Sequence, residues 1–346
     1  MTTFEHQYIE RESAAIRTER LYADPLLRWI YASPSENAAW LFRALTSART
    51  SQLLGFLNYD LPFGSATWGM NRFIRSLDVD LHECLEPAER LDSPRRVFER
   101  KLRYWEVRPM VDAPRTAVSP CDARVLVGSL ADGSSLFLKG KFFDLEELFG
   151  TNRKEWVEAF RDGDFAIFRL TPDKYHYNHT PVAGTVRDIY EIAGRYHSCN
   201  PGPVVAIATP YSKNARVVTI VDTDVPHGTG IGLVAMIEVV ALMIGRIEQC
   251  YSAARYDDPQ PVAKGLFLLK GQPKSLYRPG SSTTVLMFQR GRVAFCEDLL
   301  RNLFRPSVQS RFSRGFGRPL VETDVKVRSP IAQGLWKPEE GTGHGQ

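Results

Sequence analysis

The chain has 346 residues, of which 43% are hydrophobic and 24% charged, and its formal net charge at pH 7 is +4. This composition excludes a disordered or fibrous protein and is sufficient for one or two domains with a sizeable core. A mildly basic chain suits an anionic membrane surface as well as nucleic acid, so charge does not separate these partners. The five cysteines are odd in number and form no CxxC pair, which predicts free thiols and no metal or disulfide framework.

Neither a secretory signal nor a membrane-spanning helix is expected. The first ten residues are polar and acidic, where a signal would have a basic segment followed by an apolar one. The longest apolar run, 231–247, is interrupted by Glu238 and is shorter than the ~20 residues that a spanning helix needs. The sequence therefore predicts a soluble or peripheral protein.

Residues 1–85 are expected to be helical. Apolar side chains recur at helical spacing in 26–30, 37–45 and 53–57. Trp29 and Trp40 stand among arginines, a combination that an interfacial helix uses to bind lipid headgroups. A helical cap packed on the main domain explains the same pattern, and both interpretations stay open.

From about residue 112 the chain changes to short β-rich segments separated by Gly, Pro and Asp. The pattern predicts an α+β protein whose core, 86–335, is a β-rich sandwich or barrel, with the N-terminal helical region beside it. The stretch after Phe295 is expected to be a solvated loop, with lipid binding as the alternative. We expect a closing strand at 325–331 and disorder in 336–346. Strands are expected at 125–128, 135–138, 165–170, 185–186, 204–207, 217–221 and 266–269, and a short helix at 144–149.

One stretch joins a turn to a strand, YRPGSST at 277–283 followed by the apolar run 284–288. Proline presets φ, glycine permits a positive φ, and serine caps the segment that follows, so local chemistry alone predicts an ordinary turn. Gly280 and Ser281 indicate a function only when they are considered together with segments elsewhere in the chain.

Those segments resemble the phosphatidylserine decarboxylase family, and they follow in the order that this family shows. The resemblance covers roughly residues 90 to 335, and although each motif is weak alone, together they are specific. The segments are FERKLR at 98–103 with RP at 108–109, VSPCD at 118–122, YHYNHTPVAG at 175–184, NARV at 214–217 with GLVAMIEVVALMIGRI at 232–247, and KG at 264–265 with PGSS at 279–282.

The resemblance implies a pyruvoyl group made from Ser281. Decarboxylation of an α-amino acid requires an electron sink, and no glycine-rich phosphate loop for pyridoxal phosphate stands out. The Ser281 hydroxyl is expected to attack the Gly280 carbonyl, and elimination and hydrolysis then leave a β chain ending at Gly280 and an α chain beginning at position 281. Serine needs a base for this attack. His179 is the candidate base, with Asp122 orienting it and stabilising its imidazolium.

His176 is the candidate acid for the carbanion that remains when carbon dioxide departs, since a near-neutral pKa suits proton delivery. Tyr177 and His197 are candidate substrate contacts. The chain departs from the family in having Ala123 after Asp122, Ser282 where threonine is frequent, and Tyr177 where arginine is frequent. The carboxylate, glycine and nucleophile remain, while Tyr177 leaves the headgroup preference open.

The sequence thus predicts a self-cleaving pyruvoyl-dependent decarboxylase that converts phosphatidylserine to phosphatidylethanolamine. It is expected at the cytoplasmic face of the cell membrane as a peripheral protein, without a metal or nucleic acid. The expected assembly is an α/β heterodimer after cleavage, with a homodimer of such pairs as a further option. Two alternatives stay open: a pyruvoyl-dependent decarboxylase of a free amino acid, and a lipid-binding protein of the same fold that never processes.

Overall fold

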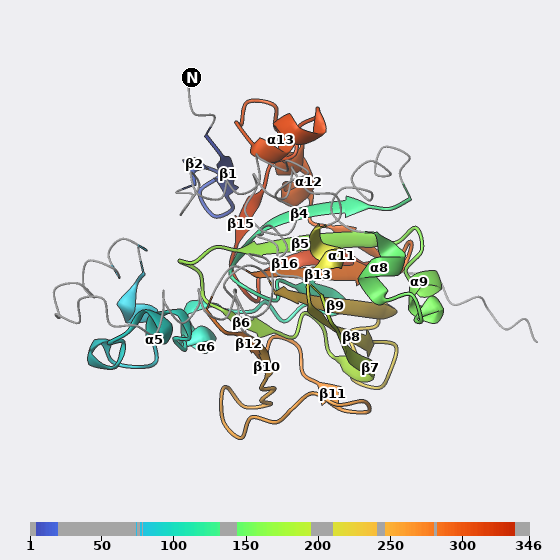
Figure 1. Ribbon diagram of the computed structural model, residues 1–346, viewed down its shortest axis with the longest axis horizontal. Helices are drawn as coiled ribbons and strands as arrows, with labels where there is room; N and C mark the ends of the chain where they lie inside the picture. The colour runs from blue at the N-terminus through green and yellow to red at the C-terminus, as the bar shows by residue number, and fades with distance from the viewer. Residues whose placement is uncertain are drawn as a thin grey trace, which may run out of the picture.

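Figure 1 shows the computed structural model of the chain. It describes residues 5–19, 74, 77, 79–131, 144–194, 210–240, 246–279 and 282–335. Several predictions fall outside the described residues: the helices at 26–57, the strands at 135–138 and 204–207, and the tail 336–346. Gly280, Ser281 and His197 also lie outside them.

A ten-stranded sheet forms the centre of the molecule (Figure 1), in the order β11-β7-β8-β9-β13-β5-β4-β15-β1-β2. Its central strand β13 pairs with β9 and β5 along its whole length and is buried throughout, as expected for an apolar, β-branched segment. Within the described residues β11 and β2 each have one neighbour, so the sheet is open. The strands are β1 (Gln7–Glu10), β2 (Ile16–Thr18), β4 (Ala123–Ser129), β5 (Asp164–Leu170), β7 (Gly184–Ile192), β8 (Arg216–Asp222), β9 (Leu233–Val240), β11 (Phe267–Leu268), β13 (Ser282–Phe288) and β15 (Thr323–Val325).

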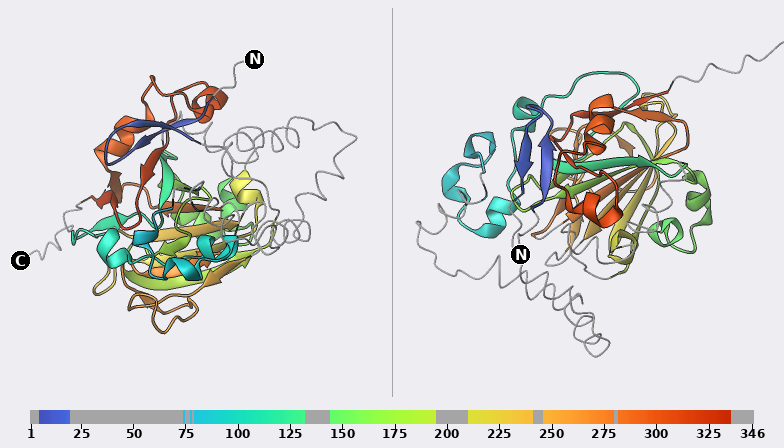
Figure 2. Two further views of the ribbon diagram at one scale, coloured as in Figure 1. Left: turned by 90° about the vertical axis from the view of Figure 1, so that its left-hand side faces the viewer. Right: turned by 90° about the horizontal axis from the view of Figure 1, so that it is seen from above.

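Two three-stranded sheets, β10-β12-β6 and β14-β16-β3, accompany the large one. A second, smaller hydrophobic core joins β6 and β12 to the short helices that precede β3, and these helices lie to one side of the large sheet in Figures 1 and 2. The remaining elements are β3 (Thr116–Val118), β6 (Tyr177–His179), β10 (Ile247–Gln249), β12 (Pro273–Tyr277), β14 (Val293–Phe295), β16 (Pro330–Gly334), the 3-10 helices η2 (Leu81–Glu83) and η3 (Ala88–Arg90), and the helices α5 (Pro94–Phe98), α6 (Tyr104–Val107), α8 (Leu145–Phe149), α9 (Lys154–Ala159), α11 (Pro210–Lys213), α12 (Glu297–Leu303) and α13 (Arg311–Phe316).

The predicted fold class is confirmed as α+β and dominated by strands. Predicted strands at 125–128, 165–170 and 217–221 fall within β4, β5 and β8. The short helix expected at 144–149 is α8, where the Asp144 side chain accepts a hydrogen bond from the Glu147 backbone at 2.8 Å. Cys84, Cys121, Cys250 and Cys296 are free thiols, also as expected.

Two predictions were wrong at the ends of the chain. Residues 7–18 were expected to be helical, but they form the β1–β2 hairpin, which joins the main sheet through a parallel pairing of β1 with β15. The stretch after Phe295 was expected to be a loop, but it forms α12 and α13. Phe312 and Phe316 lie one helical turn apart and are buried, so packing of this apolar side orders the segment. The closing strand is split into β15 and β16, which belong to different sheets.

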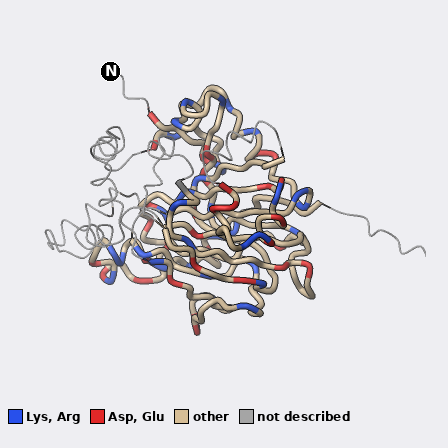
Figure 3. Tube along the Cα trace, turned by 45° about the vertical axis from the view of Figure 1, so that its right-hand side comes forward, with Lys and Arg blue, Asp and Glu red and all other residues tan. Residues whose placement is uncertain are grey.

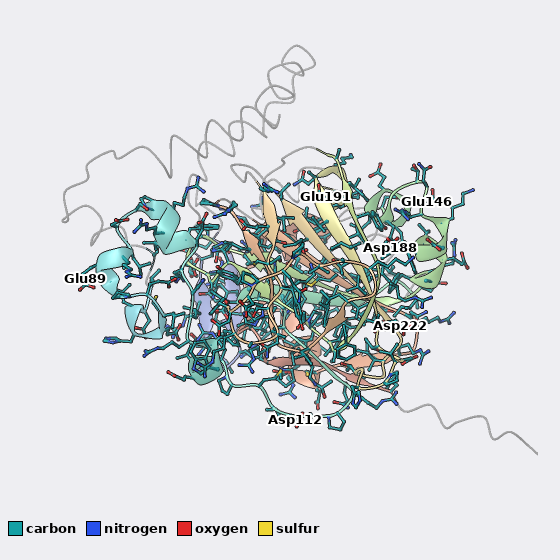
Figure 4. All side chains as sticks on the ribbon, turned by 90° about the horizontal axis from the view of Figure 1, so that it is seen from below. Glu89, Asp112, Glu146, Asp188, Glu191 and Asp222 are labelled. Atoms are coloured by element: carbon teal, nitrogen blue, oxygen red, sulfur yellow. The ribbon has the colours of Figure 1, made fainter. Side chains whose placement is uncertain are left out.

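Charged residues are interspersed along the described trace (Figure 3). Carboxylates such as Glu89, Asp112 and Glu146 lie at the periphery of the molecule (Figure 4). No helix among the described residues is long and apolar enough to cross a membrane.

Candidate active site

The two candidate histidines lie on and beside strand β6, and both are fully buried. Strand β6 pairs with β12 antiparallel, with Tyr177 opposite Leu276. The His179 backbone also donates to the Pro120 carbonyl at 2.6 Å. This bond brings the histidine segment beside the segment that carries Asp122, as the resemblance predicts.

The chain on either side of positions 280–281 is bonded to the same histidine segment. Before the junction, the Tyr277 backbone donates to the His176 carbonyl at 3.1 Å. After it, the Thr284 hydroxyl donates to the Asn178 side-chain oxygen at 2.8 Å. The Tyr277 hydroxyl then spans the junction and donates to the Thr283 carbonyl at 2.9 Å. Residues 277 and 284 therefore bracket the expected cleavage position against β6.

The hydrogen bonds of His179 determine which ring nitrogen is basic. Nδ1 lies 2.9 Å from the Gly271 carbonyl, which can only accept, so we assign the proton to Nδ1. Nε2 lies 2.9 Å from the Tyr175 hydroxyl and is the acceptor of that contact. Burial lowers the pKa of His179 to about 3, against the opposing effects of the Gly271 carbonyl and the Asp122 charge. The ring is therefore neutral, with its basic nitrogen at Nε2.

Asp122 has different partners from those predicted. Its carboxylate accepts from Arg108, with the Arg108 Nη2 atom at 2.8 Å, and from the Val327 backbone at 2.8 Å. Burial alone would raise the pKa of Asp122, but the charge and hydrogen bonds of Arg108 hold it below its usual value. The expectation that Asp122 orients His179 by a hydrogen bond is corrected, because the Gly271 carbonyl occupies Nδ1. The Asp122 charge still favours a protonated His179.

His176 differs from His179 in its polar contacts. Its ring stacks on Phe98 with centroids 3.4 Å apart, and neither nitrogen makes a hydrogen bond of normal geometry within the described part of the chain. Burial, aided by the nearby positive charge of Arg100, lowers the pKa of His176 to about 3. The near-neutral pKa expected from the sequence is therefore wrong for this structure, since the sequence cannot show complete burial beside a guanidinium.

Two buried hydroxyls lie directly after the expected cleavage position. Neither Ser282 Oγ nor Thr283 Oγ1 has a hydrogen-bonding partner among the described residues. Buried polar atoms are normally paired, so unfilled ones indicate a place for a polar group or substrate. Successive side chains of a strand point to opposite faces of the sheet, so at most one of these two hydroxyls can face a carbonyl-bearing group at position 281.

Tyr177, a candidate substrate contact, packs against Tyr175 and Tyr256, with ring centroids 5.5 and 5.2 Å away. It is 7% exposed. Its role in binding stays a prediction.

The sequence did not indicate the roles of three residues of this site. Tyr175 and Arg108 were identified only as parts of motifs, and Gly271 was given no role. A glycine in a Lys-Gly pair before a strand is a turn signal, but nothing in the sequence shows which side chain its carbonyl faces.

Comparison with known proteins defines the class to which this fold and site belong. Residues 95–311 match the family model described as phosphatidylserine decarboxylase. Phosphatidylserine decarboxylase proenzymes are similar to the chain over most of their length. The Fusobacterium nucleatum protein is 28% identical over 86% of this chain and 91% of its own length. The proenzyme of Bordetella petrii is 30% identical over 66% and 81%, and that of Clostridium tetani 26% over 85% and 91%.

The chain therefore belongs to the phosphatidylserine decarboxylase family, a family of carboxy-lyases. The matched residues include Asp122, His176, His179 and the junction at 280–281. The resemblance stated from the sequence motifs is confirmed.

Proposed function

We propose that the protein is a self-processing enzyme that decarboxylates phosphatidylserine to phosphatidylethanolamine with release of carbon dioxide. The observation that carries the proposal is the bracketing of positions 280–281 against strand β6, with two buried, neutral histidines on and beside that strand. Family membership supplies the reaction class, and the relatives are proenzymes by name.

Processing begins when the Ser281 hydroxyl attacks the Gly280 carbonyl, with His179 Nε2 as the base that accepts the hydroxyl proton. Nε2 is in contact with the Tyr175 hydroxyl and must exchange this contact for the serine hydroxyl. The Gly280–Ser281 amide bond then breaks, the Ser281 nitrogen takes up the proton from His179, and an ester remains. Loss of the Ser281 α-proton breaks the Cβ–Oγ bond of this ester and gives the Gly280 carboxylate and a dehydroalanine at 281. Hydrolysis then releases ammonia and leaves the keto-acyl end of the α chain.

A pyruvoyl group at this end supplies an electron sink for the departing carbon dioxide. His176 stands as the residue that delivers the proton to the carbon left behind. Full burial keeps its ring neutral before substrate arrives, so it must gain a proton within the complex. Asp122 supports both histidines electrostatically, because its charge favours their protonated forms.

The two chains would remain associated after cleavage. Four described strands lie in the α chain. Three of them pair with strands of the β chain, β13 with β9 and β5, β15 with β4 and β1, and β16 with β3, while β14 pairs with β16. Breaking one backbone bond leaves all these ladders in place, which supports an α/β heterodimer as the mature form. We further propose that this heterodimer works as a peripheral protein at the cytoplasmic face of the cell membrane, where its phospholipid substrate lies, and that Tyr177 and His197 contact that substrate.

Denaturing electrophoresis tests processing. The wild-type protein should give two bands in place of one at 39.1 kDa, and the smaller fragment should begin at position 281 with a blocked, ketone-bearing end by mass spectrometry. Ser281→Ala should give a single band, whereas the matched variant Ser282→Ala should still be cleaved. An active preparation with one uncut band would refute the mechanism.

Substrate choice is tested separately with lipid vesicles. Carbon dioxide should be released from phosphatidylserine vesicles and not from free serine. Release from the free amino acid alone would support the alternative enzyme. A protein that binds vesicles but never processes would support the lipid-binding alternative.

A further inference from the structure

Arg100 is a buried arginine with no carboxylate within salt-bridge distance among the described residues. It follows α5 and is 6% exposed. Its guanidinium donates to the Val97 carbonyl at 2.9 Å and to the Asp173 carbonyl at 2.7 Å, and its Nε makes no hydrogen bond within the described residues. Burial accordingly lowers the pKa of Arg100. A buried charge without a close counter-ion is costly and therefore suggests a ligand.

Other buried arginines show how unusual this is. Arg108 and Arg169 each contact two carboxylates at 2.9 Å or less. Arg216 resembles Arg100 in bonding only backbone carbonyls, but those carbonyls include Glu147 and Leu148 in the last turn of α8, so it acts as a helix cap. Arg100 caps α5 through one bond only and retains an unfilled donor.

The position of Arg100 relates it to the reaction. Phe98, two residues earlier, stacks on His176. The positive charge of Arg100 also contributes to lowering the pKa of His176. The unfilled nitrogens of His176 and Arg100 thus belong to one buried place beside the bracketed junction. The carboxylates of Asp122, Asp173 and Glu83 act on Arg100 there from beyond salt-bridge distance. An anionic group with several acceptor oxygens would fill these donors and offset the charge.

We propose that Arg100 binds the phosphodiester of the phospholipid headgroup. This assignment rests on the proposed function, and it names which of the two anionic groups of the substrate is held. A guanidinium on the carboxylate would stabilise the group that must leave as neutral carbon dioxide, so it would favour the ground state over the transition state. The phosphodiester is unchanged by the reaction, and binding it positions the headgroup without that penalty.

Kinetics of processed enzyme on phosphatidylserine vesicles test the role. Arg100→Gln should raise KM about tenfold to hundredfold, the value of a charge-assisted hydrogen bond, with a much smaller change in kcat. Arg100→Lys should fall between, because it keeps the charge and loses the fork of donors. Arg96→Gln, on the exposed side of α5, is the matched control and should behave as wild type. An unchanged KM in Arg100→Gln would overturn the proposal, as would a loss confined to kcat.

Thermal unfolding with soluble headgroups identifies the bound group without relying on turnover. Glycerophosphoethanolamine and glycerophosphoserine should both raise the midpoint of wild-type and Arg96→Gln protein, and serine should not. Both shifts should disappear in Arg100→Gln, or shrink in Arg100→Lys should the glutamine variant fail to fold. Stabilisation by serine that depends on Arg100 would assign the carboxylate instead and overturn the proposal. A wild-type protein that binds glycerophosphoethanolamine yet releases no carbon dioxide would refute the proposed function and leave the anion site standing.

Discussion

Two groups of buried charges in this molecule differ in whether each charge has an opposite charge against it. The Arg169 cluster consists of His6, Glu19, Arg124, Arg169 and Glu322. Arg169 lies 2.6 Å from Glu322 and 2.7 Å from Glu19, and Arg124 lies 2.6 Å from Glu19. In the second group, Arg100 has no carboxylate within salt-bridge distance among the described residues, and the neutral ring of His176 beside it makes no hydrogen bond of normal geometry with them.

We interpret the first group as structural and propose a functional role for the second. The Arg169 cluster joins the β1–β2 hairpin and the segment at Glu322 to the centre of the large sheet, and two arginines balance two carboxylates. Ligand atoms of His6, Glu19 and Glu322 lie within 4.8 Å of one another, a spacing that would admit a metal ion. Arg169 already neutralises both carboxylates, however, so a divalent cation would meet a guanidinium there. Arg100 in the second group has no carboxylate paired with it among the described residues, and it is there that we propose the substrate binds.

The largest effect on stability is expected from removing Arg169 from the Arg169 cluster. Arg169→Met should lower the free energy of unfolding by about 3–5 kcal/mol, because it leaves two buried carboxylates without their common partner. Urea unfolding measures this in the Ser281→Ala background, where the protein stays a single chain. Arg161→Met removes an exposed arginine paired with Glu158 and should leave the midpoint unchanged.

We also expect processed Arg169→Met protein to retain its rate of decarboxylation per folded molecule. Loss of stability without loss of activity would show that the Arg169 cluster is structural. A variant that is fully stable yet inactive would contradict the division, since it would assign the Arg169 cluster to chemistry.

A smaller effect is expected from acidification, and it acts through the second group. The pKa of His176 is about 3 in the folded protein, below its usual value near 6.5, so the unfolded chain binds the proton first as pH falls. Stability from the neutral ring is therefore complete above about pH 6.5 and is lost as pH falls toward 3. At pH 5 the loss is about 2 kcal/mol for this one histidine.

The free energy of unfolding of the Ser281→Ala protein, measured at pH 7 and pH 5, tests whether stability falls as the pH is lowered. His176→Phe should reduce the difference between the two pH values, whereas His82→Phe, at an exposed position, should not. The carboxylate of Glu322 in the Arg169 cluster stays charged at pH 5, because the charge and hydrogen bonds of Arg169 hold its pKa below the usual value. An equal pH difference in wild type and His176→Phe would show that His176 is not held neutral by burial.

Several strands and the two histidines of the site could be predicted from the sequence. Strands such as β5 and β8 were found because buried β-rich runs keep their composition wherever they pair. His176 and His179 were found because their motif is local. The β1–β2 hairpin was missed because its pairing with β15 depends on residues more than 300 positions away.

The partners of the site residues could not be predicted, because backbone groups carry no signal of what they face. The sequence suggested Asp122 as the group that orients His179, whereas the Gly271 carbonyl does so. Asp122 was proposed because its motif stands in register with the other segments of the resemblance, but the structure pairs its carboxylate with Arg108.

The smallest effect is expected at this carbonyl. Gly271 has a φ of 75°, and a Cβ there would lie 2.6 Å from the Met110 sulfur, at the flexible end of that side chain. Gly271→Ala should therefore cost about 1–2 kcal/mol of stability, mostly from the left-handed backbone. Gly265→Ala is a close control, since its φ is 87° and a Cβ would meet nothing within 4 Å. Stability losses should be similar, but only Gly271→Ala should slow self-cleavage in a pulse-chase gel, because only this change moves the acceptor that fixes the His179 tautomer. Equal cleavage rates in the two variants would mean that the Gly271 carbonyl is not what orients the base.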